Sequence, residues 1–327
     1  MTVLSKHDAL LLDLDGTVWE GGRPLSNVVD VISTCGVSAV YVTNNASRSP
    51  QAVAKMLADI GLTAGTEQIV TSAQAVLQLA AEEVPAGAKL LIIGAESLRD
   101  LARDMGFKVV SSADDKPAAV VQGFDRSVGW ENLTEGALAI RQGAKFFASN
   151  LDTSLPIERG LAVGNGSLVA AIQSATGVEP VSAGKPEPAM FTFAAKQIGA
   201  KKPLAVGDRL DTDIAGGNSA AMDTFHVLTG VSGELELIEA PVEARPNFIG
   251  AGMHELALPV SVARPGAQGG FTARCDGHDL LLEGGDEKST SVQALRTVLE
   301  VAWAMPSPPR YIQPRSERAE KVVAQWR

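Results

Sequence analysis

The pentapeptide Asp13-Leu14-Asp15-Gly16-Thr17, directly behind the apolar run Ala9–Leu12, constrains this chain most strongly. The apolar run predicts a buried strand, and the two carboxylates follow where that strand ends. Because side chains alternate along a strand, Asp13 and Asp15 face the same way if the strand stays regular. Burying two acids together is unfavourable unless a cation or a protonation change compensates. The pentapeptide therefore predicts either a polar functional site or an acidic strand-to-loop turn, where Asp and Gly are common.

The length and charge of the chain limit the classes of protein to which it belongs. Its 327 residues favour two domains over one. The formal net charge of -10 argues against a general binder of nucleic acid or of anionic membranes, although a metal ion can reverse the sign locally for a small anionic substrate. The lead Met1–His7 is short and polar, and the first apolar run ends at Asp13, too early for a membrane span. We therefore expect a cytoplasmic protein without membrane insertion.

The cysteines and histidines predict no metal centre of their own. Cys35 and Cys275 lie far apart and outside any CxxC pair, so we expect two reduced, buried thiols. The four histidines show no HxxxH or HExxH spacing, which argues against a zinc site.

Strand-like and helix-like segments alternate along most of the chain. The expected strands are 9–14, 37–43, 89–93, 118–122, 145–149 and 204–206, and the expected helices are 24–35, 50–60, 96–105, 130–141 and 187–198. This alternation predicts an α/β fold with a doubly wound, Rossmann-like parallel sheet. The strand–helix pattern of the N-terminal segment resumes at residue 184. We therefore expect a discontinuous core of residues 1–65 and 184–258, with a second α/β domain of residues 66–183 inserted in it.

The tail, residues 259–327, has a different pattern and is expected to form a small α+β appendage. Asp276-Gly277 between two apolar runs predicts a hairpin. Apolar residues at three- and four-residue spacing from Val292 to Trp303 predict an amphipathic helix. That helix packs either on the core or on a second subunit, so a homo-oligomer is one of the two interpretations.

Three further polar clusters lie at the ends of expected elements. Thr43-Asn44-Asn45 follows a strand, Gly184-Lys185-Pro186 opens a helix, and Gly207-Asp208 to Asp213 follows the strand 204–206. Ligands of open parallel sheets bind at the carboxyl ends of strands, so these clusters can converge with Asp13 and Asp15. Taken singly, each has an ordinary structural interpretation as a turn residue, a solvated lysine or a helix cap.

The acids Asp13 and Asp15 suit the covalent chemistry of phosphoryl transfer. Asp13 can act as a carboxylate nucleophile that forms an aspartyl-phosphate. Asp15 can protonate the leaving alkoxide and then activate water as a base.

The other clusters supply donors, charge and metal ligands for the same chemistry. Thr43 and Asn44 offer neutral donors to phosphoryl oxygens, and Lys185 offers a fixed positive charge. Asp208 is an oxygen ligand suited to Mg²⁺, and Asp213 can hold a metal-bound water or orient Lys185. Asp211, in contrast, is interpreted as a helix cap outside the site.

These four motifs, in this order, resemble those of the haloacid-dehalogenase-superfamily phosphatases over roughly residues 8–250. The resemblance implies Mg²⁺ dependence, the roles given above, a metal ligand in the backbone carbonyl of Asp15, and a part for Asn45 in phosphate binding beside Thr43 and Asn44. A dehalogenase is a rival within the superfamily, but a dehalogenase does not need the second acid, Asp15.

The long insertion between Asn45 and Lys185 resembles the type-two cap of the nitrophenylphosphatase-like branch, which makes residues 66–183 a cap domain. The segment Ala148–Asp152 resembles a cap loop of that branch. This implies that Asn150 and Asp152 face the active site, with an Asx turn as the structural alternative.

Within that branch, the chain is most similar to mycobacterial glycerol 3-phosphate phosphatases, which also carry a C-terminal extension. The resemblance implies hydrolysis of glycerol 3-phosphate in phospholipid headgroup recycling. The alternatives are another small phosphorylated metabolite, such as phosphoglycolate, pyridoxal phosphate or a nucleoside monophosphate, and a non-catalytic phosphate-ligand-binding protein on the same fold.

Overall fold

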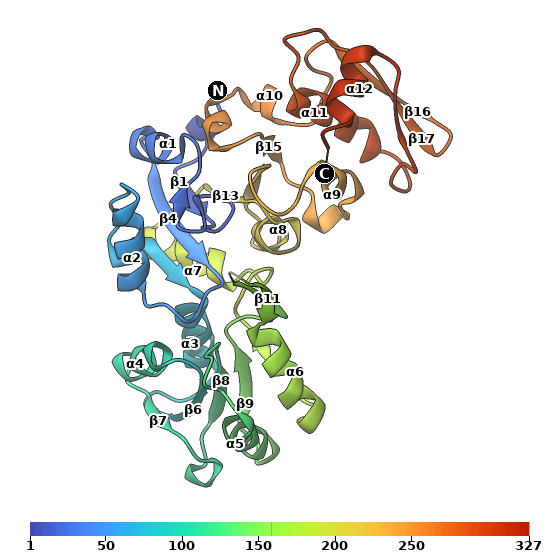
Figure 1. Cartoon of the computed structure of the whole chain (residues 1–327). Coiled ribbons are helices and arrows are strands. Elements are labelled where there is room, and N and C mark those ends of the chain that lie inside the picture. The colour runs from blue at the N-terminus through green and yellow to red at the C-terminus, as the bar shows by residue number, and fades with distance from the viewer. Residues whose placement is uncertain (158, 327) are drawn as a thin grey trace. The chain divides into compact units, whose positions relative to one another are not determined.

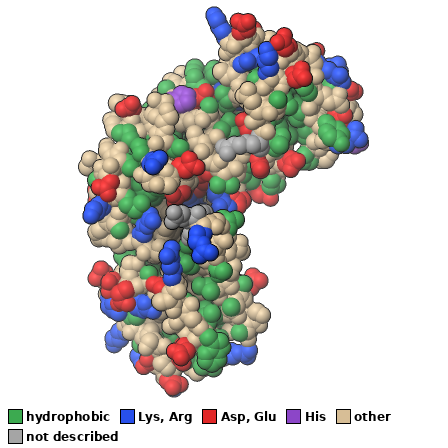
Figure 2. All heavy atoms as spheres, viewed as in Figure 1, with side chains coloured by type: hydrophobic (Ala, Val, Ile, Leu, Met, Phe, Trp, Pro, Cys, Tyr) green, Lys and Arg blue, Asp and Glu red, His purple; other side chains and the backbone are tan. Residues whose placement is uncertain are grey.

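The computed structural model in Figure 1 describes residues 1–157 and 159–326. These residues form two compact units. The first unit comprises Met1–Val40, Ile60–Leu62 and Gly199–Arg327, and the second comprises Tyr41–Asp59 and Thr63–Ile198. In the described part of the chain, none of the helices combines the length and the apolar character needed to cross a bilayer. On the face shown in Figure 2, acidic and basic side chains are interspersed.

A parallel sheet at the centre of the first unit places its strands in the order β15, β14, β13, β1. The strands are β1 (Ala9–Leu12), β13 (Pro203–Gly207), β14 (Asp223–Val227) and β15 (Phe248–Gly250). The helices of this unit before the tail are α1 (Val28–Thr34), α8 (Ala215–Ser219) and α9 (Glu234–Glu239), and α10 (Val260–Ala263) begins the tail. All four residues of β1 are buried, as expected for a parallel strand covered on both faces. The prediction of an α/β fold with parallel strands is confirmed.

The segment before α1 differs from the sequence prediction. Pro24 does not begin a helix; it lies in the short hairpin of β2 (Trp19–Glu20) and β3 (Arg23–Pro24). Gly21 and Gly22 have φ values of 56° and 78°, which a two-residue hairpin turn requires. The paired glycines therefore outweigh the preference of proline for the first turn of a helix.

The second unit contains a five-stranded parallel sheet in the order β12, β9, β8, β6, β7. The strands are β6 (Lys89–Ile93), β7 (Lys108–Val110), β8 (Ala119–Gln122), β9 (Lys145–Ala148) and β12 (Val181–Ser182). The helices are α2 (Pro50–Asp59), α3 (Ser72–Glu83), α4 (Glu96–Asp104), α5 (Trp130–Arg141), α6 (Asn165–Thr176) and α7 (Ala189–Ile198). Apolar residues of β6, β8 and β9 form one buried cluster with α5 and α6. The bounds of β6 and α5 agree with the sequence prediction.

Two strand pairs complete the second unit. The end of β4 (Ser38–Thr43) pairs in parallel with β5 (Ile69–Thr71), with Tyr41 opposite Ile69. The hairpin of β10 (Ser154–Ile157) and β11 (Gly160–Val163) was not expected from the sequence.

The tail has the predicted α+β character. The predicted hairpin is present as β16 (Phe271–Asp276) and β17 (Asp279–Gly284), and β18 (Ile312–Pro314) pairs with β17. After α10, the tail contains the helices α11 (Ser291–Ala302) and α12 (Glu317–Val323).

The apolar face of α11 packs on the core of the first unit. Leu295 and Leu299 belong to one buried cluster with Leu237 of α9 and Ile249 of β15. Arg296, which is 1% exposed, donates from Nε to the carbonyl oxygen of Ile249 at 3.0 Å. The sequence left open whether the amphipathic helix packs on the core or on a second subunit, and in the structure it packs on the core.

The prediction of two buried thiols is wrong. Both cysteines are free, but Cys35 is half-buried at the end of α1, and Cys275 is exposed on β16. β16 is the outer strand of its sheet and buries only Phe271 fully, so its last residues face water.

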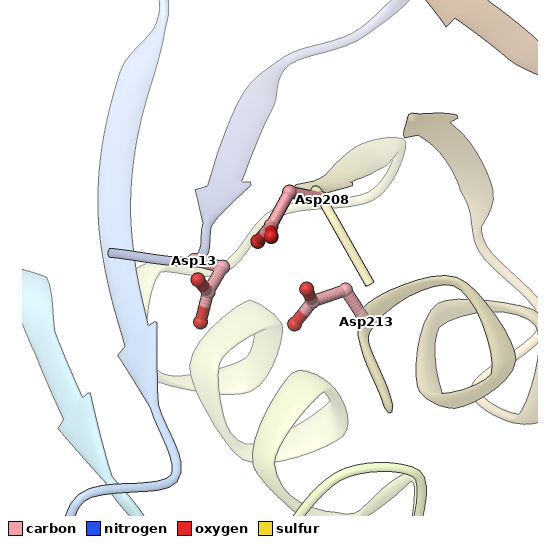
Figure 3. Close-up of side chains that lie close together, drawn as sticks. All are labelled: Asp13, Asp208 and Asp213. Carbon is pink, nitrogen blue, oxygen red and sulfur yellow. The ribbon is translucent and has the colours of Figure 1, made fainter. Parts of the chain in front are cut away.

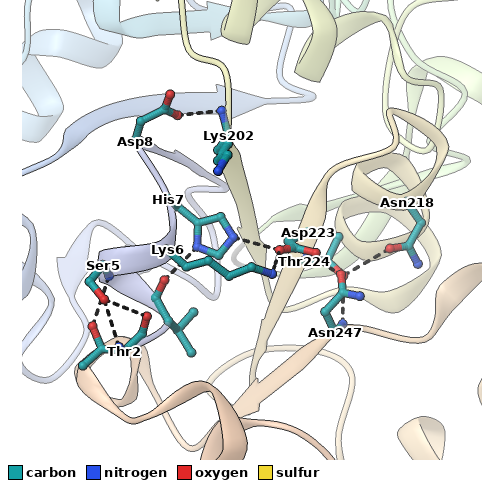
Figure 4. A network of polar contacts seen from close by, with 11 residues as sticks. Thr2, Ser5, Lys6, His7, Asp8, Lys202, Asn218, Asp223, Thr224 and Asn247 are labelled. Atoms are coloured by element: carbon teal, nitrogen blue, oxygen red, sulfur yellow. Dashed lines mark hydrogen bonds and ion pairs between the residues drawn. The ribbon is translucent and has the colours of Figure 1, made fainter.

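A polar network joins the N-terminal segment to the start of β14, as Figure 4 shows. Asp223 accepts from Lys6 Nζ at 2.5 Å and from His7 Nε2 at 3.0 Å. Burial alone raises the pKa of the Asp223 carboxyl, but the hydrogen bonds from Lys6 and His7 outweigh burial and hold that pKa below its usual value. The network therefore stabilises the fold while Asp223 is ionised.

We expect Asp223→Asn to lower the free energy of unfolding by about 1 kcal/mol at neutral pH, because water partly screens the pair. A carboxyl with a depressed pKa stabilises the fold above its unfolded pKa of about 3.9, and that contribution disappears as the pH falls through the folded pKa. Urea titrations from pH 7 to pH 3.5 measure the free energy of unfolding of the variant and of the wild type. The difference between the two free energies should become smaller below about pH 4. The exposed Asp104→Asn is the control, and a difference that stays constant with pH contradicts the assignment.

Candidate active site

Three carboxylates converge at the carboxyl ends of β1 and β13 (Figure 3). Asp13 follows β1, Asp208 follows β13, and Asp213 lies in the π turn η4 (Leu210–Ile214). One carboxylate oxygen of each lies within 4.8 Å of the others. Asp13 is half-buried, while Asp208 and Asp213 are buried. The sequence placed all three among the candidate residues, and the structure brings them together.

The register of the two strands explains this convergence. Leu12 lies opposite Val206 in neighbouring parallel strands, and the Asp13 N–H donates to the carbonyl oxygen of Val206 at 2.9 Å. A Cβ atom on Gly207 would lie 2.2 Å from Cβ of Asp213, so a glycine is needed for η4 to return this close to the strand. The exposed Asp211 pairs with Arg209 and stays outside the cluster, as expected.

Asp208 is held by a side chain of the pentapeptide and by a backbone N–H of the segment after β14, which the sequence did not indicate as part of the site. Its Oδ1 accepts from Thr17 Oγ1 at 3.3 Å, and its Oδ2 accepts from the Val231 N–H at 2.7 Å. A Cβ atom would approach Asp208 Oδ2 to 2.4 Å at Gly16 and to 1.9 Å at Gly230. Gly16 also has a φ of +87°, so its place in the pentapeptide has both a conformational and a steric cause.

Asp15 lies outside the group of three carboxylates. Regular strand geometry ends at Leu12, so the condition for Asp13 and Asp15 to face the same way is not met. Asp15 is exposed, and its Oδ1 accepts from Trp19 Nε1 at 2.9 Å. Trp19 is itself 2% exposed, so a buried indole orients this acid. The sequence carried no signal for this contact.

The donor set of the cluster fits a hard divalent cation. Three carboxylates this close repel one another, and a cation between them offsets that repulsion. Oxygen-only ligands suit Mg²⁺ or Ca²⁺ rather than zinc, which prefers nitrogen and sulfur. The backbone N–H of Arg209 donates to Asp213 Oδ2 at 3.1 Å, which helps to fix the orientation of this carboxylate.

In the second unit, Asn44 connects three other predicted site residues. Its Oδ1 accepts from the Lys185 N–H at 2.8 Å, and its Nδ2 donates to the Lys185 carbonyl oxygen at 3.2 Å. The same Nδ2 lies 3.3 Å from Oδ2 of Asp152. The Asn44 carbonyl oxygen accepts from Asn150 Nδ2 at 2.8 Å. Four candidates from three segments that lie far apart in the sequence therefore share one hydrogen-bond network.

The remaining candidates have local contacts. The Asp152 N–H donates to Asn150 Oδ1 at 3.2 Å, so the Asx turn considered for this loop is present beside the contacts to Asn44. Asn45 Oδ1 accepts from the Ser47 N–H at 2.9 Å in a turn of its own, outside the Asn44 network. Thr43 is buried, and its Oγ1 accepts from the Asn45 N–H at 3.2 Å.

Lys185 is 4% exposed, and its Nζ donates to the carbonyl oxygen of Val42 at 3.1 Å. The peptide bond between Lys185 and Pro186 is cis. A Cβ atom on Gly184 would lie 2.7 Å from Cβ of Asn150, so only glycine lets the Lys185 segment pass this close to the Asn150 loop. The solvated lysine that a single Lys before Pro suggests is not observed.

Comparison with known proteins decides the family. Residues 10–108 match the haloacid dehalogenase-like hydrolase family, and residues 182–256 match the HAD-hydrolase-like family. The D-glycerol 3-phosphate phosphatase of Mycobacterium tuberculosis is 41% identical over 99% of this chain and 95% of that protein. This chain belongs to the haloacid dehalogenase-like hydrolases.

Solved structures agree with this hydrolase family. A glycerol phosphate phosphatase from Mycobacterium tuberculosis, crystallised with magnesium, is 39% identical with a TM-score of 0.95, over 100% of this chain and 98% of that one. A 4-nitrophenylphosphatase from Thermotoga maritima is 28% identical with a TM-score of 0.73, over 80% of this chain and 100% of that one. The predicted resemblance to the nitrophenylphosphatase-like branch, and within it to mycobacterial glycerol 3-phosphate phosphatases, is confirmed.

Proposed function

We propose that this hydrolase is a Mg²⁺-dependent phosphatase that releases glycerol and phosphate from glycerol 3-phosphate. The cluster of Asp13, Asp208 and Asp213 carries the proposal, because its oxygen donors fit Mg²⁺ at the edge of the sheet where ligands bind. The similarity to the M. tuberculosis phosphatase supports the substrate, since it extends over 99% of the chain and so includes the tail.

In the first step, an Asp13 carboxylate oxygen attacks phosphorus and the phosphorus–oxygen bond to the alcohol breaks. Asp15 gives its proton to the departing oxygen, which yields the free alcohol. When bound, Mg²⁺ supplies positive charge to the phosphoryl oxygens and to the attacking carboxylate.

In the second step, the Asp15 carboxylate takes a proton from water as that water attacks the aspartyl-phosphate. The phosphorus–oxygen bond to Asp13 breaks, phosphate leaves, and both acids return to their starting state. The hydrogen bond from Trp19 Nε1 orients the Asp15 carboxylate for both proton transfers.

The second unit supplies the remaining proposed roles. Lys185 provides fixed positive charge, Thr43 and Asn44 donate to phosphoryl oxygens, and Asn150 and Asp152 contact the leaving group. The backbone carbonyl of Asp15 as a metal ligand, Asn45 as a phosphate ligand and residues 66–183 as the cap domain also stay proposals. We place the activity in the cytoplasm, in the recycling of phospholipid headgroups.

Phosphate release from a panel of phosphomonoesters, with Mg²⁺ and with EDTA, tests the function. We expect metal-dependent turnover that is fastest on glycerol 3-phosphate. Faster turnover of phosphoglycolate, pyridoxal phosphate or a nucleoside monophosphate keeps the mechanism and rejects the substrate. If the folded, Mg²⁺-loaded protein hydrolyses none of these esters, a phosphate-ligand-binding protein is the better conclusion.

Asp15→Asn should slow turnover more for glycerol 3-phosphate than for p-nitrophenyl phosphate. An alkoxide needs a proton to leave, whereas p-nitrophenolate leaves without one, and general acid catalysis contributes roughly 10²–10⁴-fold. The ratio of kcat/KM values for the two esters, in the wild type and the variant, measures this difference. Equal losses for both esters would show that Asp15 is not the acid.

A further inference from the structure

His226, near the end of β14, is fully buried and has no part in the proposed reaction. Its Nε2 lies 3.0 Å from the carbonyl oxygen of Ser232. A carbonyl oxygen only accepts hydrogen bonds, so Nε2 carries the proton. Nδ1 is buried and has no hydrogen-bond partner among the residues that the structure describes. Burial lowers the pKa of His226 to about 4, so the ring is neutral at pH 7.

The hydrogen bond from His226 closes a loop that leaves β14 and returns beside Asp208. The Ser232 N–H donates to the Asp208 carbonyl oxygen at 3.1 Å, and Ser232 Oγ accepts from the Leu210 N–H at 3.2 Å. Thr229 Oγ1 donates to the carbonyl oxygen of Gly16 at 2.6 Å. The loop 229–232 is therefore fastened on both sides of the Asp208 carboxylate.

The donor that this loop presents to the carboxylate cluster is a backbone group. The Val231 N–H lies 2.7 Å from Asp208 Oδ2, and Gly230 permits that approach because a Cβ atom there would clash with the same oxygen. A backbone donor is only as well placed as the loop that carries it. His226 is the side chain that ties the far end of this loop to the sheet.

We propose that His226 is a positioning residue, which fixes the loop 229–232 so that Val231 orients the Asp208 carboxylate and raises the affinity of the carboxylate cluster for Mg²⁺. This inference rests on the proposed function, because it takes Asp208 as a metal ligand. Groups that orient a metal ligand typically change metal affinity by about 10–100-fold. His226 acts through one intervening loop, so we expect an effect at the lower end of that range, about tenfold.

The test compares His226→Phe with His226→Gln. Phe keeps a flat ring of similar size but removes the donor, while Gln keeps an N–H close to the position of Nε2. Calorimetric titration with MgCl₂ measures metal affinity without turnover, and kinetics at saturating Mg²⁺ measure kcat and KM. We expect His226→Phe to raise the Mg²⁺ Kd about tenfold, with kcat and KM at saturating Mg²⁺ within about twofold of the wild type, and His226→Gln to recover most of the affinity.

The matched control is a variant whose core is destabilised away from the loop 229–232. Val298→Ala removes buried volume from α11 and should leave the Mg²⁺ Kd unchanged. If His226→Phe folds and binds Mg²⁺ as tightly as the wild type, the positioning role is wrong. If that variant does not fold, His226→Asn, whose amide is too short to reach Ser232, takes its place under the same criterion. A wild-type protein that binds no Mg²⁺ would instead overturn the proposed function together with this inference.

Discussion

Asp13→Asn should reduce phosphate release from glycerol 3-phosphate by at least about 10³-fold, while the protein keeps its wild-type Tm. The amide has the shape of the carboxylate but is a much weaker nucleophile, so no aspartyl-phosphate forms. The change also removes one negative charge from the cluster with Asp208 and Asp213, which should weaken Mg²⁺ binding. Initial rates at saturating Mg²⁺ separate the lost nucleophile from the weaker metal site.

Asp211→Asn is the matched control for this prediction. Asp211 comes from the same motif as Asp208 and Asp213, but it is exposed and paired with Arg209 outside the cluster. We expect near-wild-type rates for this variant. Turnover by Asp13→Asn above about a tenth of the wild-type rate would rule out Asp13 as the nucleophile, and an equal loss in both variants would point to a general charge effect.

A chain that ends at Leu258 should fail to unfold cooperatively and should bind a hydrophobic dye. Removing the tail exposes Leu237, Ile238 and Ile249, which α11 and its neighbours bury. Exposing a side chain of this size costs about 1.5–3 kcal/mol, and domains have only about 5–15 kcal/mol of stability. Circular dichroism during heating, dye fluorescence and size-exclusion chromatography measure the outcome. A folded, monomeric product with the wild-type Tm would contradict the shared core.

A point substitution in the full chain tests the same interface without removing the tail. Leu295→Ala should lower the free energy of unfolding by about 2–5 kcal/mol, because Leu295 is fully buried in the shared cluster. Glu300→Ala, at an exposed position of the same helix, should change it by less than about 0.5 kcal/mol. If both variants lose a comparable amount of unfolding free energy, the packing of α11 on the core is not the cause of the destabilisation.

The tail illustrates the boundary between sequence and structure. The spacing of its apolar residues predicts an amphipathic helix, and α11 is present over Ser291–Ala302. Periodicity shows that a face needs a partner but not which partner. The partner of α11 is set by α9 and β15, whose apolar residues also needed cover and which reach α11 only through the folded chain.

For the candidate site too, the sequence predicted some features and only the tertiary structure decided others. The order of four motifs led to Asp13, Asp208, Asp213, Asn44 and Lys185, because acids and amides at strand ends are visible in the sequence. The contact of Trp19 with Asp15 and that of Val231 with Asp208 could not be predicted, because no sequence pattern around these residues indicates which residue each of them meets. The helix expected from Pro24 failed for a local reason, because the neighbouring Gly21-Gly22 pair forms a hairpin turn instead.

By itself, the sequence determined the α/β alternation, the parallel-sheet core, the motif order and thereby the hydrolase family. These depend on spacing and residue type over short stretches of chain. Only the tertiary structure decided which backbone segments hold Asp208, which side chain orients Asp15 and what the tail covers. Such contacts form between residues up to about 200 positions apart, as Thr17 and Asp208 are, and their geometry comes from packing that no local pattern encodes.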